Sequence, residues 1–283
     1  MHAELRRPAL YVVATPIGNL GDITLRALDT LRATDVVAAE DTRVTARLLA
    51  HFGIDKPVLA LHRHNERQAA ARVLRELDAG RVVALVSDAG TPALSDPGAV
   101  LIAHVRECGF DVIPIPGASA LAAAWSVAGM AETGFVFHGF LPARAGERRK
   151  VLASLARLPY ALVFYEAPHR VLETAVDLGE VLGGERRVVA VRELTKIFET
   201  VHACPLAELR AWLEADANRQ RGEFVLIVGA ARTLEPQRAF GEDALRVLLE
   251  ELKPAQAARL AARLSGVSKS ELYALAVRGR SSE

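Results

Sequence analysis

Five short apolar runs alternate with segments of helical spacing over the first 115 residues, and this alternation restricts the fold more than any other feature of the chain. Neighbouring parallel strands need a crossover of a dozen or more residues, so this spacing predicts a parallel sheet with helical connections. The expected strands are Leu10–Ala14, Val36–Ala39, Val58–Leu61, Val82–Val86 and Asp111–Ile115. The expected helices are Thr24–Leu31, Thr42–Phe52, Glu66–Leu77 and Gly98–Cys108. Ligands of such sheets bind beyond the carboxyl ends of the strands.

Pro114 and Pro116 interrupt the pattern, because two prolines in three residues prevent a helix from continuing. We place a domain junction there, between an α/β domain at 1–116 and a second at 117–232. The second domain is expected to be α/β with a more mixed sheet, whose strand candidates are Phe135–His138, Ala161–Tyr165, Val188–Arg192 and Phe224–Val228.

The last part of the chain, 240–283, changes to helix-forming residues and predicts a small helical tail. Ala255–Leu264, a glycine-containing turn at 265–268 and Lys269–Val277 have the size of a helix-turn-helix unit. Two interpretations stay open: the second helix contacts nucleic acid, or the helices dock on the body or on a partner subunit.

The composition is that of a folded protein, with 51% hydrophobic and 24% charged residues in 283. No apolar run approaches the roughly 20 residues that a membrane helix needs, so we expect a cytoplasmic protein with no membrane partner. Cys108 and Cys204 lie far apart without a second Cys or a spaced His beside them, which argues against a disulfide framework and a zinc motif.

Positive charge is concentrated in two segments, although the net charge is only +1. Lys253 to Arg280 holds six Lys or Arg residues against a single Glu, and Arg144 to Lys150 holds four against one Glu. Such segments can bind the phosphates of a nucleic acid, or they can be solvated faces. Charge alone does not decide between these interpretations.

The loop Val86–Gly98 (VSDAGTPALSDPG) is the most informative segment for chemistry, since it follows a predicted strand and combines carboxylates with glycines and prolines. Gly90 permits close approach of a ligand, and Asp88 or Asp96 could accept hydrogen bonds from hydroxyl or ammonium groups. In the alternative interpretation the loop is an ordinary connection, with Asp96 capping the next helix.

Three further segments are expected at the same edge of the sheet. The loop after the first strand lacks the patterns of a dinucleotide site and of a P-loop. Asp41 after the second strand is best interpreted as a helix N-cap. After the third strand, His62 and His64 lack further ligands of compatible spacing, so substrate contacts are favoured over a metal; a solvated turn with Asn65 as helix cap is the alternative.

Polar residues also follow strands in the second domain. Glu166 ends one apolar run, while Glu193 and Lys196 follow another, where folding alone gives them no obvious role. Glu166 could instead pair with Arg170 on a helix and be inert. These three residues are our catalytic candidates.

Taken in order, the segments resemble the tetrapyrrole methylase superfamily, and within it the branch of the ribosomal RNA small-subunit methyltransferases I, which methylate the 2′-hydroxyl of a cytidine in 16S ribosomal RNA. The segments that carry the resemblance are LYVVATPIGNLGDIT, AAEDTR, HRHNE, VSDAGTPALSDPG, IPGASAL, FHGFLP, FYEAPHR, RELTKIFE and GEFVLIVG.

The resemblance implies two α/β domains with S-adenosylmethionine in the cleft between them, a homodimer, a small-subunit ribosomal RNA or 30S particle as partner, and no metal. By similarity, the cofactor is expected to contact Pro16, Gly18, Asp88, Gly90, Thr91, Pro92, Ser119, Ala120, Val163, Phe164 and Val225.

For the chemistry, our hypothesis is that Lys196 stabilises the developing oxyanion of a ribose hydroxyl and that Glu166 or Glu193 acts as base or orients it. The residues expected to contact RNA are Arg43, His62, Arg148, Arg149, Lys150 and Lys269. Two rival functions stay open: methylation of a corrinoid or porphyrin precursor by the same fold, and RNA binding by an assembly factor without catalysis.

Overall fold

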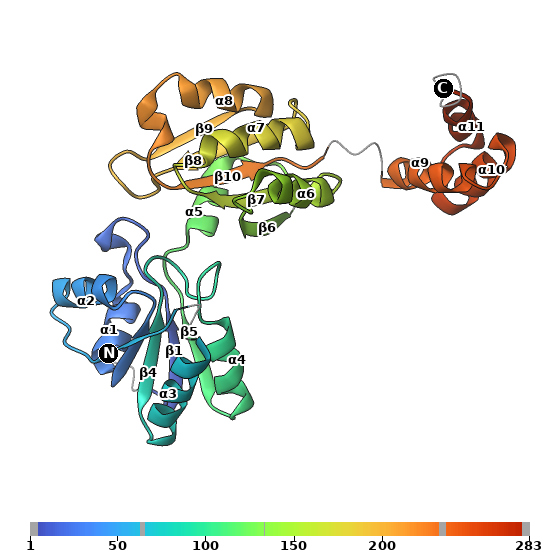
Figure 1. Cartoon of the computed structure of the whole chain (residues 1–283). Coiled ribbons are helices and arrows are strands. Elements are labelled where there is room, and N and C mark those ends of the chain that lie inside the picture. The colour runs from blue at the N-terminus through green and yellow to red at the C-terminus, as the bar shows by residue number, and fades with distance from the viewer. Residues whose placement is uncertain (1–4, 63–65, 133, 232–235, 279–283) are drawn as a thin grey trace.

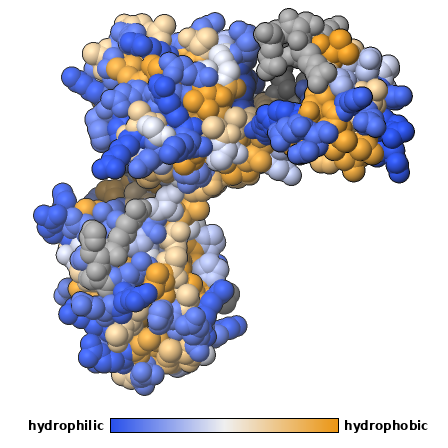
Figure 2. Space-filling model, turned by 45° about the vertical axis from the view of Figure 1, so that its right-hand side comes forward, coloured by the Kyte–Doolittle hydropathy of each residue, from blue (hydrophilic) through white to orange (hydrophobic). Residues whose placement is uncertain are grey.

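The computed structural model describes residues 5–62, 66–132, 134–231 and 236–278. It forms two α/β lobes, joined at a narrow waist, and a separate helical tail (Figures 1 and 2). His64 and Asn65, named above, lie outside the described residues. Within the described ranges no helix is both long and apolar enough to cross a membrane.

The first sheet is wholly parallel, with the strand order β3-β2-β4-β1-β5, as the alternation predicted. β1 and β4 are central and fully apolar, which is typical of a strand covered on both faces. The strands are β1 (Ala9–Val13), β2 (Val36–Ala39), β3 (Val58–Ala60), β4 (Val82–Val86) and β5 (Asp111–Ile115).

Helices cover both faces of this sheet (Figure 1). Alternate side chains of β1 point to opposite sides: Tyr11 packs with α1 (Leu25–Ala33) and α2 (Thr42–His51), whereas Leu10 packs with α3 (Glu66–Asp78) and α4 (Ala99–Glu107). A short 3₁₀ helix, η1 (Leu20–Asp22), precedes α1. Since every strand is parallel, the loops at their carboxyl ends meet at one edge, which faces the second lobe.

The second sheet is mixed, as predicted: β6 and β7 are parallel and all other neighbours are antiparallel, in the order β6-β7-β10-β8-β9. β9 (Thr200–Pro205) was not predicted, because its polar sequence lacks a continuous apolar run. The other strands are β6 (Phe135–Phe140), β7 (Ala161–Glu166), β8 (Arg187–Arg192) and β10 (Phe224–Val228).

The two faces of the second sheet are covered unequally. α6 (Ala145–Leu155), α7 (Val171–Leu182) and α8 (Leu206–Glu214) pack on one face, together with Leu162 and Phe164. α5 (Ala120–Ala128) packs on the other, with Val163. The short helix η2 (Ala217–Gln220) follows α8. The single helix leaves part of the second face open toward the first lobe.

The tail consists of α9 (Pro236–Leu249), α10 (Pro254–Ser265) and α11 (Lys269–Arg278), packed around a core of its own. Small residues of α10, including Ala258 and Ala261, let the helices approach closely around Leu272. Gly266 ends α10 in the left-handed conformation that favours glycine. The helix-turn-helix arrangement predicted for the tail is therefore present.

The helices α2 and α4 are capped in different ways. Asp41 caps α2 as predicted, accepting a hydrogen bond from the backbone N–H of Arg43 at 2.8 Å. For α4, the alternative interpretation named Asp96 as the cap, but the N-cap residue is Gly98. The cap comes from α3 instead, where Oε1 of Glu66 accepts from the N–H groups of Gly98 at 2.7 Å and Val100 at 3.1 Å.

We expect Glu66→Ala to lower the free energy of unfolding by about 1 kcal/mol, because the substitution removes the carboxylate that accepts from the N–H groups of Gly98 and Val100 at the start of α4. Urea unfolding followed by circular dichroism measures this change. Arg72→Ala, on an exposed position of the same helix, is the matched control and should shift stability by less than about 0.5 kcal/mol. Equal effects of the two substitutions would contradict a capping role.

Candidate active site

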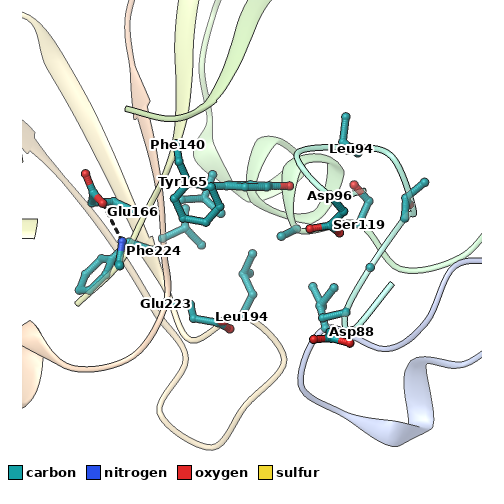
Figure 3. Close-up of a pocket in the computed structure, with 18 of the residues that line it drawn as sticks. Asp88, Leu94, Asp96, Ser119, Phe140, Tyr165, Glu166, Leu194, Glu223 and Phe224 are labelled. Carbon is teal, nitrogen blue, oxygen red and sulfur yellow. Dashed lines mark hydrogen bonds between the residues drawn. The ribbon is translucent and has the colours of Figure 1, made fainter. Parts of the chain in front are cut away.

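A cavity of about 420 Å³ lies where the loop edge of the first sheet meets the open face of the second (Figure 3). Its size is within the range of small-molecule sites in proteins. The first lobe and the start of α5 contribute Ile17, Glu40, Asp88, Ala89, Gly90, Thr91, Leu94, Asp96, Ser119 and Ala120. The second lobe contributes Phe140, Tyr165, Glu166, Ala167, Pro168, Val191, Leu194, Glu223, Phe224 and Val225.

Hydrogen bonds hold the loops of the first lobe together. Thr15 and Gly90 exchange two backbone hydrogen bonds, of 2.9 and 3.0 Å, so the loops after β1 and β4 form one wall. The side chain of Asp88 accepts from the backbone N–H of Asp41 at 2.9 Å, which adds the loop after β2. Thr91 donates to the carbonyl of Ala118 at 3.2 Å and thereby links this wall to the start of α5.

The backbone is strained on both sides of the cavity. Ala93 and Ser95 in the first lobe, and Glu193 and Thr195 in the second, have φ between +52° and +68° without being glycine. Such conformations cost on the order of 1–3 kcal/mol each and persist where surrounding contacts fix them, often at functional sites. All four residues lie in the two loops that carry cavity-lining residues.

The lining of the cavity is acidic. Glu40, Asp88, Asp96 and Glu223 contribute carboxylates, and no Lys or Arg is among the described residues that line it. An acidic lining favours a cationic ligand over an anionic one. In the described part of the chain, no group of three or more His, Cys, Asp and Glu residues is placed to hold a metal ion.

Lys196 stands beside this cavity between two carboxylates. Its Nζ lies 2.8 Å from Oε1 of Glu193 and 2.8 Å from Oε2 of Glu223. Burial disfavours the ammonium, but hydrogen bonds to the two carboxylates outweigh burial and raise the pKa of Lys196. Burial likewise opposes the charged form of Glu193, and the bonds from Lys196 and from the backbone N–H of Glu223 still lower the pKa of Glu193. The pair is ionised at neutral pH.

Two glycines allow this arrangement. A Cβ on Gly18, in the first lobe, would lie 2.6 Å from Cγ of Lys196, so the loop after β1 and the lysine touch across the waist. A Cβ on Gly222, where φ is +85°, would lie 2.3 Å from Cγ of Glu193. Any side chain at Gly222 would displace the carboxylate that holds Lys196.

Glu166 is held by structural contacts, which do not suit a catalytic base. Its carboxylate accepts from Oγ1 of Thr174 at 2.6 Å and from the backbone N–H of Ala167 at 2.8 Å, and it pairs with Arg170. The side chain of Glu166 has no exposed surface. The residue borders the cavity, but its carboxylate is held by these partners, so the inert pairing with Arg170 is the interpretation that the contacts favour.

Some of the residues expected to bind the cofactor line the cavity and others do not. Asp88, Gly90, Thr91, Ser119, Ala120 and Val225 line the cavity. Pro16, Gly18, Pro92, Val163 and Phe164 are not among the lining residues. Val163 is buried beneath α5, while Phe164 is in the core under α7. Gly18 faces Lys196 instead.

The residues expected to contact RNA also differ in position. Arg148 is only 1% exposed, and its Nε lies 2.5 Å from Oδ2 of the buried Asp177, so the prediction that it contacts RNA is wrong. Arg149 is half-exposed and pairs with the same Asp177. Lys150 and the other three candidates are exposed: Arg43 (paired with Asp41), His62 and Lys269.

Sequence reasoning did not single out Phe140, Tyr165 or Glu223 as site residues. For Tyr165 the signal was present, since strand alternation places it on the same face as Val163 and opposite to Phe164. For Glu223, the signal was its place directly before β10, beside the end of β8. The orientation of Phe140 depends on an irregularity of β6 that the sequence does not reveal.

The comparisons with known proteins agree with this architecture. Residues 9–210 match the model of the tetrapyrrole (corrin/porphyrin) methylases, which is more than half of the chain. The chain belongs to this family. Residues 235–280 match the RsmI C-terminal HTH domain, so the tail also has relatives of its own.

Similar proteins include the ribosomal RNA small subunit methyltransferase I of Pseudomonas aeruginosa, 51% identical over 93% of this chain and 95% of that protein. The protein of the same name from Escherichia coli O157:H7 is 49% identical over 97% and 96% of the two chains.

Among solved structures, the methyltransferase CobJ covers 81% of this tetrapyrrole methylase at 20% identity, with 97% of its own chain aligned and a TM-score of 0.59. Uroporphyrin-III C-methyltransferase from Thermus thermophilus, complexed with S-adenosylhomocysteine, covers 78% at 21% identity, with 97% of its own chain aligned and a TM-score of 0.56. At these identities the structures show the shared fold.

We expect Arg148→Ala to lower the free energy of unfolding by about 3–5 kcal/mol, because it removes one partner of a buried ion pair with Asp177. Lys150→Ala, two positions along on the exposed side of α6, should change it by less than about 0.5 kcal/mol. Thermal and urea unfolding of both variants measure the difference. A stable Arg148→Ala protein with weakened RNA binding would restore the original assignment of Arg148.

Proposed function

We propose that this chain is an S-adenosylmethionine-dependent methyltransferase of small-subunit ribosomal RNA, and that it methylates the 2′-hydroxyl of a cytidine. The relatives of about 50% identity over nearly the whole chain support the RNA substrate. The cytidine and its 2′-oxygen rest on the segments by which the sequence resembles that branch. The observation that carries the proposal is the acidic cavity with Lys196 at its edge, paired with Glu193 and Glu223.

The cavity fits S-adenosylmethionine in charge and in size. That cofactor carries a sulfonium and an ammonium group, and when bound it supplies an electrophilic methyl group. Asp88 and Asp96 on the first wall and Glu223 on the second place negative charge around the volume that it would occupy. Gly90, whose φ is +78°, brings its backbone close to this volume, since a Cβ there would contact Ile17 at 3.3 Å.

Lys196 is the residue that we assign to the reacting oxygen. A ribose hydroxyl is a weak acid, so a fixed cation near it lowers the energy of the oxyanion that develops as the hydroxyl loses its proton. Lys196 can act as a cation, because its raised pKa keeps it protonated, and for the same reason it cannot serve as the base.

Glu193 orients Lys196 in this scheme. A carboxylate whose pKa is lowered by two hydrogen bonds is a weak base, so proton removal is a poor role for it. Its fixed position, with Oε1 bound by both Lys196 and the N–H of Glu223, instead holds the ammonium in one place. Alignment of this kind supplies a large part of the rate in a displacement reaction.

For RNA binding we propose Arg43, His62, Arg149, Lys150 and Lys269, all of which are exposed in the free protein. Arg43 and Arg149 would exchange their present carboxylate partners for phosphates. A cytoplasmic protein follows from such a substrate.

We also propose a homodimer. Its support is the exposure of large apolar side chains at the start of α1 and in the loop after β8: Leu25 is 81%, Ile197 90% and Phe198 66% exposed, and exposed apolar patches often mark protein interfaces.

The first test uses methyl-labelled S-adenosylmethionine and small ribosomal subunits from cells that lack this enzyme. We expect label in 2′-O-methylcytidine after digestion, and Lys196→Met should lower kcat by about 10²–10³-fold through loss of oxyanion stabilisation. Lys56→Met, in the first lobe and outside the cavity lining, is the matched control and should retain wild-type turnover.

No label in RNA from protein that binds the cofactor would contradict the proposal and favour a corrinoid or porphyrin precursor as acceptor. Label at another atom or nucleoside would overturn the cytidine 2′-hydroxyl alone. Unchanged turnover of a folded Lys196→Met protein would remove the role assigned to Lys196.

The pairing of Lys196 with Glu193 and Glu223 also predicts a pH dependence. Carboxylates stabilise the ammonium form, so they raise the pKa of Lys196, and Glu193→Gln should lower that pKa. We therefore expect the alkaline decline of kcat, which marks loss of the Lys196 charge, to begin at lower pH in Glu193→Gln than in the wild type. The measurement is kcat against pH from 7 to 11 at saturating substrates. Superimposable profiles would show that Glu193 does not act through Lys196.

A further inference from the structure

Phe140 owes its orientation to a bulge in β6. In β7, Val163 and Tyr165 face α5 and the cavity, whereas Phe164 faces the opposite core. β6 pairs Phe137 with Val163, but the next pairs are Gly139 with Phe164 and Phe140 with Tyr165. One extra residue, His138, is thus inserted, and side chains after it change faces.

Without the bulge, Phe140 would pair with Glu166 and enter the core under α7. With it, Phe140 stands opposite Tyr165 on the cavity side, and the rings meet edge to face with centroids 5.6 Å apart. Gly139 makes this possible: its φ is +79°, and a Cβ there would lie 2.4 Å from Oγ of Ser95. The bulge therefore also lets the first lobe approach β6 closely.

Phe140 is 50% exposed although it lines the cavity. In Figure 3, it lies with Tyr165 on one side of the cavity, and Asp88 and Ser119 lie on the other. Besides the edge-to-face contact with Tyr165, half of the Phe140 side chain stays exposed beside the acidic cavity. Another aromatic ring can stack on its exposed face from the solvent side.

We infer that Phe140 is the stacking platform for the nucleobase of the nucleotide whose ribose is methylated, and so a positioning residue for the RNA. This inference rests on the proposed function. Sequence-specific RNA recognition commonly splays a base out of its stack onto an aromatic side chain. Stacking there would hold the attached ribose at the acidic cavity, where Lys196 can reach the hydroxyl.

The adenine of the cofactor is the other flat ring that Phe140 could bind. The position of Phe140 favours the RNA base: small-molecule sites bury most of their ligand, whereas the ring of Phe140 is half-exposed and lies across the cavity from Asp88 and Ser119. A base that belongs to a large RNA must enter from the open side.

The test compares Phe140→Leu, Phe140→Tyr and Phe135→Leu with the wild type. Phe135 is the matched control, since it lies on the same strand, is 38% exposed and does not line the cavity. We measure kcat/KM on unmethylated small subunits, the Kd of S-adenosylmethionine by calorimetry, and the unfolding midpoint.

For Phe140→Leu we expect kcat/KM for subunits to fall about 5- to 150-fold, which is the range of base–aromatic stacking, with the cofactor Kd unchanged within twofold. Phe140→Tyr keeps the ring and should stay within threefold of wild type, as should Phe135→Leu.

Two results would overturn the inference while leaving the proposed function intact: wild-type kcat/KM in a folded Phe140→Leu protein, or a cofactor Kd weakened by the same factor, which would assign the ring to adenine. Absence of any methyl transfer to subunits by the wild type would instead remove the proposed function, and this inference with it.

Discussion

The alternation of side chains across the second sheet is the constraint on which the site depends. β7, β8 and β10 are adjacent and in register, so Tyr165, Val191 and Val225 share one face while their sequence neighbours enter the opposite core. Three helices cover that opposite face and one helix covers the first. α5 covers only part of the face that carries Tyr165, Val191 and Val225. The rest of that face forms a cavity wall because the loop edge of the parallel sheet lies against it.

Charge placement follows from this geometry. The lining is acidic, so a lysine inside it would be drawn to the carboxylates that a cationic ligand requires. Lys196 stands at the edge of the cavity instead, where it pairs with the lining residue Glu223 and with Glu193, whose side chain is only 16% exposed. The loop that carries Lys196 bends through two residues with positive φ, and Gly222 leaves space for the Glu193 side chain. The strained backbone of this loop thus helps to position the ammonium of Lys196.

The tail is organised by a different principle. Small residues of α10 contribute much of its core, and an exposed ion pair between Arg157 and Asp243 links it to the second lobe. Exposed ion pairs contribute about 0–1 kcal/mol, so this pair alone does not fix the tail against the second lobe. A helical unit with its own core and a weak attachment suits a role in holding a large substrate better than a role in the chemistry.

Patterns within single elements could be predicted from the sequence, whereas features that depend on distant partners could not. The apolar runs placed all five strands of the first sheet, and strand ends correctly indicated Asp88 and Gly90 at the cavity. The same logic argues against Glu166 as a base, since strand alternation places it on the same face of β7 as the core residue Phe164. Arg148 could not, because Arg148 and Arg149 look alike in sequence and both pair with Asp177; only the folded structure shows that Arg148 is buried and Arg149 half-exposed. Phe140 depends on a one-residue bulge, and a shift of one residue moves a strand side chain to the other face without leaving a trace in the hydrophobic pattern.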